Sequence, residues 1–413
     1  MLNWCATFNI CAFLDNHAYQ LPGHRYECLA GCGVHQQVSV TGINALEQLQ
    51  QFLNSTNDWC FGHLSYDLWH QLEQCGAAPP DPAGFPLLTF FVPQYVLQLS
   101  DEALVIASLA ADHTQVWEAI VNTAATKAPQ QQVTQVQERV SKQQYLETVQ
   151  ALQRHILRGD CYEINYCIGF DASPVSIEPV LVYQRLSALS PNPFSAFYRV
   201  EDAFLLCASP ERFLRRQGNQ LLSQPIKGTW KRNQLSAAAD AAHKEALFNS
   251  AKDRSENVMV VDLVRNDLSR VCVQGTVQVD ELFGIYTFPQ VHQMISTISG
   301  RVDTQLSFTD VIKATFPMGS MTGAPKRKVM ELIQRYETTG RGLFSGAVGY
   351  INPEGDFDFN VVIRSIFYNQ ASGACSFLVG SGITHYSNPE AEYEECLLKA
   401  AAMQQALAAA STV

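Results

Sequence analysis

Short apolar runs between turn residues recur along the chain and predict a protein rich in β-strands. The clearest runs cover residues 59–66, 87–93, 161–170, 204–209, 344–350, 359–367 and 374–379. Apolar positions at helical spacing lie between them, over residues 43–53, 115–125, 141–159 and 241–270, and again after residues 325 and 388.

The strand predicted over residues 161–170 carries two polar side chains among apolar ones. Glu163 and Asn165 share one face, while the opposite face is formed by Tyr162, Ile164, Tyr166 and Ile168. Such a polar face meets either solvent or a polar cavity. Solvent is the more common environment, and it is the one we expect here.

A polar, glutamine-rich stretch over residues 126–144 marks the expected boundary between two parts of the chain. Residues 1–130 are predicted to form a strand-rich N-terminal scaffold subdomain, and residues 131–410 a catalytic region. Ser141 and Gln144 can form a capping box at the start of a helix.

Carboxylates run into an apolar stripe on the helix predicted over residues 241–270. Asp253, Glu256 and Asn257 lie on one face, which valines continue. Buried carboxylates need a cation, and their hard oxygen atoms suit magnesium.

A second acidic group begins the last predicted helix. Asn388 is a suitable N-cap, Pro389 suits the first turn, and Glu390, Glu392 and Glu395 follow. The helix macrodipole also favours acidic residues at an N-terminus, so this group alone is weak evidence for a metal site.

Glycine-rich backbone and an arginine in an apolar run indicate an anionic ligand. The loop over residues 316–325 leads into a helix and offers free backbone N–H groups, although it lacks the phosphate-loop and dinucleotide-binding patterns. Arg364 is predicted to lie in the middle of a strand, where a guanidinium without an anionic partner is costly. That partner is either structural or a substrate carboxylate.

The stretch over residues 223–232 presents the amine of Lys227. Pro225 and Gly228 predict a tight turn around it. By itself this stretch is more typical of a solvated basic loop, since a nucleophilic lysine needs an environment that lowers its pKa. Glu211 is either half of a surface ion pair or, if it is buried near Lys227, a general acid with a raised pKa.

Composition and charge narrow the class of protein. The chain has 413 residues, 47% of them hydrophobic and 16% charged, which suits a large core. Its net charge of −11 argues against a nucleic-acid backbone as the ligand. We see no secretory signal, no apolar run long enough to span a membrane and no cysteine pattern typical of zinc sites. A reduced, cytoplasmic, soluble protein is the expected class.

Taken together, these motifs resemble those of the chorismate-utilising enzymes. The resemblance runs from about Ser141 to Lys399 and is more specific than any one motif. Its members, in the family's order, are Pro225-Ile-Lys-Gly-Thr229, Lys252-Asp-Arg-Ser-Glu-Asn257, Asp262-Leu-Val-Arg-Asn-Asp-Leu268, Thr322-Gly-Ala-Pro-Lys326, Val348-Gly-Tyr350, Ile363-Arg-Ser365, Gly380-Ser-Gly382 and Ala391-Glu-Tyr-Glu-Glu395.

The resemblance implies an α+β fold of two large antiparallel sheets with outer helices. It also implies a reaction, because lysine at position 227 is typical of the aminodeoxychorismate synthase branch, component I, whereas anthranilate synthases carry alanine there. Lys227 is then expected to attack the chorismate ring and ammonia to displace it, giving 4-amino-4-deoxychorismate for 4-aminobenzoate and folate synthesis. Glu211 matches the general acid that protonates the departing hydroxyl.

The remaining site residues are also carried over from the resemblance. Glu256 and Glu395 match two magnesium ligands, with Asp253 and Glu392 beside them. The positions that match contacts to the substrate or line its ring are Thr229, His292, Thr322, Tyr350, Arg364, Gly380, Ser381, Gly382 and Lys399. Glu163 departs from the branch, which more often has glutamine there, and its position helps to select the nucleophile.

The resemblance further implies that ammonia comes from a separate glutamine amidotransferase subunit, since a chain of this length has no room for a glutaminase module. Two alternatives stay open. One is anthranilate synthase component I, and the other is a non-catalytic binding protein with the same fold.

Overall fold

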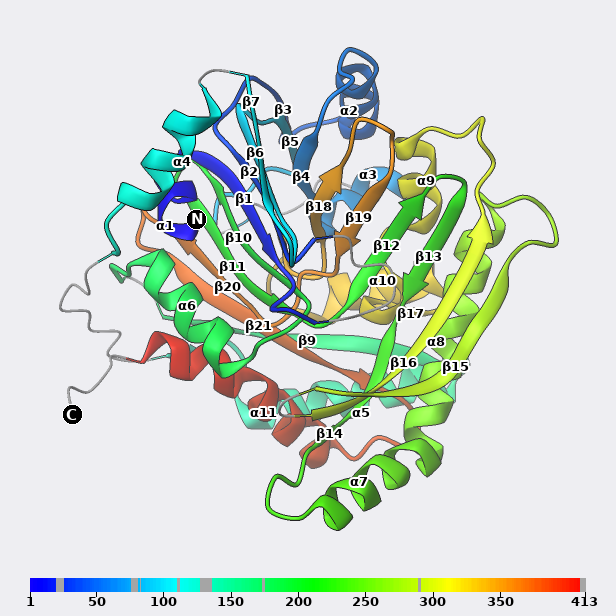
Figure 1. Ribbon diagram of the computed structural model, residues 1–413. Helices are drawn as coiled ribbons and strands as arrows, with labels where there is room; N and C mark the ends of the chain where they lie inside the picture. The colour runs from blue at the N-terminus through cyan, green and yellow to red at the C-terminus, as the bar shows by residue number, and fades with distance from the viewer. Residues whose placement is uncertain are drawn as a thin grey trace.

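The computed structural model describes residues 1–19, 26–75, 81, 83–109, 112–126, 136–172, 175–288 and 291–408. Two large antiparallel sheets stand side by side with helices around them, as the resemblance implied for an α+β fold (Figure 1). Among the described residues, no helix is long and apolar enough to cross a bilayer.

The first sheet joins strands from the beginning, middle and end of the chain. Its order is β17 (Gly323–Ala324), β9 (Glu163–Asp171), β21 (Cys375–Ile383), β20 (Ser365–Asn369), β11 (Ala203–Ser209), β10 (Phe194–Val200), β1 (Ile10–Asp15), β2 (Cys28–Cys32), β6 (Tyr95–Leu99) and β7 (Leu104–Ser108), with β8 (Gln137–Glu138) paired to β9.

The second sheet is built in the same mixed way. Its order is β14 (Ile226–Lys231), β16 (Val291–Arg301), β13 (Gln220–Gln224), β12 (Arg212–Gln217), β19 (Phe357–Asn360), β18 (Ala347–Ile351), β4 (Cys60–Leu64), β5 (Leu88–Val92) and β3 (Gln36–Val40), with β15 (Gln278–Thr287) also paired to β16.

Helices cover the outside of both sheets. The α-helices are α1 (Leu2–Cys5), α2 (Ala45–Asn54), α3 (Trp69–Leu72), α4 (His113–Asn122), α5 (Lys142–Leu157), α6 (Pro179–Leu189), α7 (Ala237–Asn249), α8 (Ala251–Ser269), α9 (Phe308–Thr315), α10 (Lys326–Tyr336) and α11 (Pro389–Leu407), with 3₁₀ turns η1 (Tyr66–Leu68) and η2 (Gly319–Met321). Helices α5, α6 and α11 pack on the first sheet, and α8 packs on β14 and β16 of the second.

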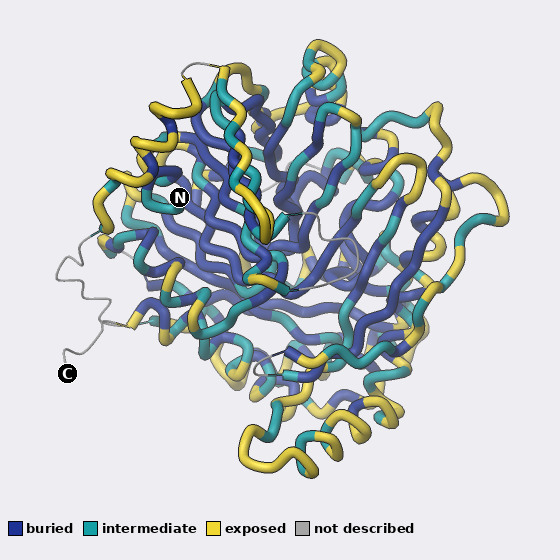
Figure 2. Tube along the Cα trace, viewed as in Figure 1, coloured by how far each residue is buried: buried dark blue, intermediate teal, exposed yellow. Residues whose placement is uncertain are grey.

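Alternation along the strands divides the core in two. On β1, Ile10 and Ala12 enter a cluster shared by both sheets, while Cys11 and Phe13 enter a second cluster under the helices of the first sheet. Figure 2 shows the result as buried strands with exposed outer helix turns. The first sheet is therefore covered on both faces.

Strands from the N-terminal third are interleaved with later strands. β1 lies between β10 and β2, and β4 lies between β18 and β5. Residues 127–135, around the expected boundary near residue 130, lie outside the described residues, so that division stays a prediction.

One local prediction, a helix cap, held, and two predictions failed where the chain changes direction. The capping box of Ser141 and Gln144 is confirmed. The single helix predicted over residues 241–270 is wrong, because Ser250 breaks it. Its backbone is extended and its side chain accepts the N–H of Asp253, which starts α8 anew.

The strand predicted over residues 359–367 is also wrong. β19 belongs to the second sheet and β20 to the first, so residues 361–364 carry the chain across. Arg364 lies at this crossing with a φ of 51°, in the left-handed region, and not in the middle of a strand.

Candidate active site

Two crossings between the sheets meet at one place and bring Glu211 beside Arg364. The chain leaves β11 in the first sheet and enters β12 in the second through Pro210 and Glu211. The Val361 N–H donates to the Glu211 carbonyl at 3.0 Å, and the Ala208 N–H donates to the Arg364 carbonyl at 3.2 Å. These backbone hydrogen bonds therefore fix Glu211 and the cationic Arg364 at the junction of the sheets.

Glu211 has the electrostatic environment of a proton donor. Burial raises the pKa of its carboxyl to about 7, against opposing effects of the Ser320 hydroxyl, Lys227, the Ile226 N–H and Arg364. A carboxyl with this pKa is partly protonated at neutral pH. The alternative of a surface ion pair is wrong, because Glu211 is buried and the neighbouring arginine pairs with Asp358 instead.

Arg364 has no carboxylate within ion-pair distance among the described residues. Burial lowers the pKa of its guanidinium to about 10, and the charge of Glu211 only partly opposes that effect. Of the two kinds of partner that the sequence left open, a structural carboxylate in an ion pair is not found among the described residues. A cation held in this way is suited to an anionic ligand.

Lys227 lies in a bulge of strand β14, where a tight turn was expected. The pairing of β14 with β16 shifts between Ile226 and Thr229, so Lys227 and Gly228 fall in the irregular part. Gly228 has a φ of 89°, and a Cβ there would lie 2.9 Å from the Asp253 carboxylate. The bulge thus presses the chain against α8 and turns the Lys227 side chain inward.

The Lys227 amine meets Glu163 of the first sheet. Its Nζ donates to Glu163 Oε1 at 2.6 Å, and a Cβ at Gly382 would lie within 3.1 Å of the same nitrogen. Burial lowers the pKa of Lys227, but the carboxylates of Glu163, Glu256 and Glu211 outweigh burial and raise it. In this state the lysine is protonated.

Glu163 does not face solvent, contrary to our expectation. Its side chain is only 2% exposed, and its Oε2 atom is buried without a hydrogen-bond partner. Lys227 of β14 reaches the Glu163 side chain on the polar face of β9, while Gly323 and Ala324 of β17 pair with the edge of β9. Gly323 has a φ of 144°, and a Cβ there would lie 2.1 Å from the Glu163 carbonyl.

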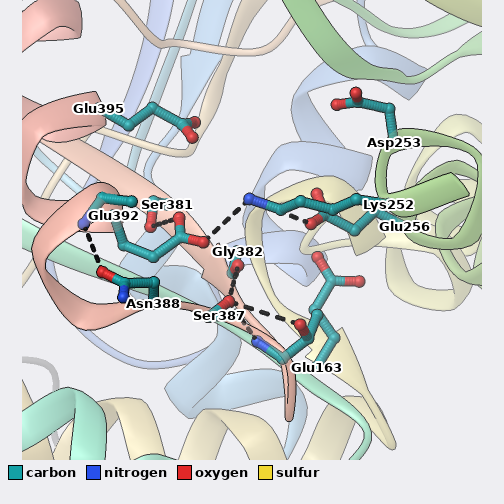
Figure 3. Close-up of polar contacts among 12 residues, drawn as sticks. Glu163, Lys252, Asp253, Glu256, Ser381, Gly382, Ser387, Asn388, Glu392 and Glu395 are labelled. Atoms are coloured by element: carbon teal, nitrogen blue, oxygen red, sulfur yellow. Dashed lines mark hydrogen bonds and ion pairs between the residues drawn. The ribbon is translucent and has the colours of Figure 1, made fainter. Parts of the chain in front are cut away.

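A group of carboxylates from α8 and α11 lies near Glu163, with the Lys252 amine among them (Figure 3). Burial raises the pKa of Glu256 to about 7, and its Oε1 atom is buried without a hydrogen-bond partner. Glu392 accepts a hydrogen bond from the Ser381 hydroxyl at 2.8 Å, and Glu395 pairs with Lys399 at 2.7 Å. These oxygen atoms are the donors that a magnesium ion prefers.

Lysine side chains occupy the spaces between these carboxylates. Lys252 Nζ lies 3.0 Å from Glu392 Oε1 and 3.8 Å from Glu256 Oε1. Within the described part of the chain, no three histidine, cysteine or acidic side chains are arranged to hold a metal ion together. The donor chemistry fits magnesium, while the side chains as they lie here are paired with ammonium groups.

Comparison with known proteins places the chain in a family. Residues 19–405 match the model of the chorismate binding enzymes. The chain belongs to this family. A relative from Salmonella typhimurium, aminodeoxychorismate synthase component 1, is 36% identical over 337 residues, which are 81% of this chain and 73% of that protein.

Other relatives in this family extend well beyond the part that matches this chain. The Escherichia coli aminodeoxychorismate synthase component 1 is 39% identical over 63% of this chain and 56% of its own length. The Streptomyces pristinaespiralis aminodeoxychorismate synthase is 41% identical over 70% of this chain, which spans 42% of that protein.

Solved structures agree on the fold. Anthranilate synthase component I from Streptococcus pneumoniae has a TM-score of 0.80 at 23% identity, covering 93% of both chains. The menaquinone-specific isochorismate synthase MenF from Escherichia coli has a TM-score of 0.77 at 19% identity, covering 98% of this chain and 91% of that one. At these identities the likeness concerns the fold of the chorismate binding enzymes and not the reaction.

Not every predicted residue of this chorismate binding enzyme lies at the Lys227 centre. His292 is buried, but its ring contacts Asp240 at 3.0 Å and Thr287 at 3.1 Å, beside a separate cavity of about 330 Å³. Tyr350 lines another cavity and packs against the rings of Tyr26, Trp59 and Phe61.

The other residues predicted to contact the substrate make contacts within the protein itself or are exposed. Thr229 is exposed, whereas the buried Thr322 hydroxyl donates to the Met318 carbonyl at 3.2 Å. The Ser381 hydroxyl donates to Glu392, and the Lys399 amine donates to the Gly380 carbonyl at 2.9 Å. Gly380 and Gly382 are paired with β9, and a Cβ at either position would lie within 3 Å of a β9 side chain.

Two site residues escaped the sequence analysis. Ser320 lies in the glycine-rich loop and bonds Glu211, but nothing in the loop pattern distinguishes its hydroxyl. Lys252 stands one helical turn before Glu256 in the sequence, a spacing that is typical of a surface ion pair. That Lys252 lies between two helices could be seen only in the structure.

Proposed function

We propose that the protein is component I of an aminodeoxychorismate synthase, which converts chorismate and ammonia to 4-amino-4-deoxychorismate and water. The observation that carries this proposal is the Lys227 amine, only 12% exposed and held at 2.6 Å by Glu163, in a site where the buried Glu211 carboxyl has a pKa of about 7. The names of the relatives in Salmonella typhimurium and Escherichia coli support the same assignment.

The proposed chemistry needs one nucleophile and one acid. The Lys227 amine forms a bond to a ring carbon, the ring double bonds shift, and the hydroxyl leaves as water with a proton from Glu211. Ammonia then bonds to the carbon that lost the hydroxyl, and the bond to Lys227 breaks. Hydroxide is a poor leaving group, so a carboxyl that keeps its proton near neutral pH is the appropriate donor.

Lys227 must lose its proton before it attacks. The base in contact with it is Glu163, at 2.6 Å. We propose that Glu163 accepts the Lys227 proton and can pass it on. Its Oε2 atom is buried without a hydrogen-bond partner and gives the carboxylate a second oxygen that can carry the proton.

Anion recognition in this proposal rests on the Arg364 guanidinium and on the glycine backbone of β21. Arg364 has no carboxylate partner among the described residues, and Gly380 to Gly382 add backbone next to Lys399. A substrate carboxylate would supply the missing partner. We therefore assign the enolpyruvyl carboxylate to Arg364 and place no contact on Tyr350.

Magnesium is proposed as the cofactor, held by Glu256 and Glu395 with Asp253 and Glu392 close by. The unpartnered, buried Glu256 Oε1 atom supports this assignment. A bound magnesium ion would offset the charge of the ring carboxylate of chorismate.

A separate glutamine amidotransferase subunit is proposed as the source of ammonia. The words "component 1" in the names of several relatives support a second component. The chain itself should then use ammonium salts without glutamine.

Product analysis tests the function directly. The purified protein is incubated with chorismate, magnesium chloride and an ammonium salt, and the products are identified by mass spectrometry. We expect 4-amino-4-deoxychorismate with retention of the enolpyruvyl group. Direct formation of anthranilate would instead favour anthranilate synthase, the alternative suggested by the structural likeness.

A further inference from the structure

The Lys252 side chain lies between α8 and α11, the two helices that carry the proposed magnesium ligands (Figure 3). It belongs to the first turn of α8, and its amine reaches across to Glu392 in the first turn of α11. The distances to Glu392 Oε1 and Glu256 Oε1 are 3.0 and 3.8 Å. One ammonium group thus serves carboxylates from both helices.

The two partners of Lys252 differ in how firmly they are held. Glu392 is 2% exposed and receives the Ser381 hydroxyl on its other oxygen, so its carboxylate is fixed. The Lys252 side chain is 52% exposed and has a flexible four-carbon stem. Only the lysine can leave this place without unpacking the core.

Four carboxylates of the site have an ammonium neighbour in this structure. Lys227 pairs with Glu163 and Lys399 pairs with Glu395, while Lys252 is shared by Glu256 and Glu392. An ion bound by Glu256 would approach within about 2.1 Å of its oxygen. A divalent cation and the Lys252 ammonium would then repel each other strongly at such close range.

We propose that Lys252 is a built-in counter-ion that occupies the space between Glu256 and Glu392 and is displaced when a divalent cation binds. This inference rests on the proposed magnesium site. In the absence of the ion, the lysine keeps the buried carboxylates from repelling one another and keeps α8 and α11 in register. The protein lowers its own metal affinity in exchange.

The test compares metal affinity in the absence of chorismate. Binding of Mg²⁺ is measured by titration calorimetry and that of Mn²⁺ by electron paramagnetic resonance, in wild type, Lys252→Met and Lys252→Arg. We expect Lys252→Met to bind the ions at least about tenfold more tightly at low salt, since a competing charge is removed. Lys252→Arg should bind no more tightly than wild type.

Lys142→Met is the matched control. Lys142 pairs with Glu394 on the outer face of α11 at 3.4 Å, and its side chain is 50% exposed. Removing this charge should change the affinity by less than about twofold, because exposed charges are screened. A similar gain in both methionine variants would mean a general charge effect and would overturn the proposal.

The other outcomes are equally decisive. Equal or weaker binding by Lys252→Met would show that the lysine assembles the site and does not compete with the ion. Absence of binding in every variant would overturn this inference together with the magnesium site. Formation of 4-amino-4-deoxychorismate by the wild type is scored separately, so the function can stand when the counter-ion proposal fails.

Discussion

At the scale of single residues, the site depends on an amine whose surroundings keep it protonated. Lys227 is buried, yet the nearby carboxylates raise its pKa. A lysine used only for charge balance would behave in the same way. Substitution distinguishes the two functions, because a nucleophile cannot be replaced by another cation.

Removal of the Lys227 amine should abolish most turnover without unfolding the protein. We expect Lys227→Ala to lower the formation of 4-amino-4-deoxychorismate by about 10³-fold or more, since no other amine takes its place. Lys227→Arg restores the positive charge and should be equally inactive. Rates are measured by mass spectrometry and folding by circular dichroism. Wild-type rates in Lys227→Arg would exclude a nucleophilic lysine.

Glu211 should set an upper pH limit for activity. Burial raises the pKa of its carboxyl to about 7, so the protonated acid is lost as the pH rises through that value. At a fixed concentration of free ammonia, activity should therefore fall above about pH 7. Glu211→Gln should be about 10²–10⁴-fold slower and should lack this limb. A limb that persists in Glu211→Gln would assign it to another group.

The same shift affects stability in a defined direction. The folded protein binds the Glu211 proton more tightly than the unfolded chain, whose carboxyl has the ordinary pKa of 4.5. The contribution of this group to stability therefore falls as the pH rises from about 4.5 to about 7. Glu211 is in this sense a residue that favours function over stability.

At the scale of elements, the bulge in β14 determines where Lys227 points. Gly228 allows the bulge because its φ is 89° and because α8 leaves no room for a side chain. Two separate costs are thus expected for a larger residue, one from the backbone and one from the contact with Asp253.

A matched pair of substitutions separates these costs. Gly218 has a φ of 57°, and a Cβ there would meet no atom within 4 Å. Gly218→Ala should therefore lower the free energy of unfolding by only about 1 kcal/mol. Gly228→Ala should cost about 1–3 kcal/mol and also reduce turnover, because the bulge shifts away from α8. Denaturant unfolding and steady-state rates provide the two measurements. Equal effects in both variants would mean that the contact with Asp253 is unimportant.

The elements also explain which parts of the fold the sequence revealed. The runs at residues 59–66, 87–93 and 204–209 are strands because local apolar patterning decides burial there. The break at Ser250 was missed because the apolar and polar pattern continues across it. The crossing at residues 361–364 was missed because its residues are as apolar as a strand, although they connect different sheets.

The same limit applied to the site. Glu256 and Glu395 were found as motifs on two helices, but the arrangement of the lysines between them depends on how α8 meets α11. The environment of Glu163 depends on Lys227 of β14 in the other sheet and on β17, which pairs with the edge of β9. Such packing across distant segments leaves no local signal.

At the scale of the whole molecule, the substrate anion is proposed to bind where the chain passes between the sheets. Arg364 lies at one crossing and Glu211 at the other, and each crossing is tied to the other by backbone hydrogen bonds. A ligand on Arg364 should therefore stabilise the junction of both sheets at once. Arg364 is a partly buried cation with no ion-pair partner among the described residues.

Arg364→Gln should separate stability from binding. Without chorismate, the variant should unfold at the same temperature as wild type or higher, because removal of an unpaired buried charge breaks no ion pair. With chorismate at about 100 times its Kd, wild type should gain about 2.7 kcal/mol, and the variant should gain little at the same concentration. Differential scanning fluorimetry provides both comparisons. A variant that is strongly destabilised without chorismate, but shifted by chorismate as much as wild type, would identify Arg364 as a structural residue. Because the two crossings lie in the same junction, such a result would also remove the reason for placing the substrate between the sheets.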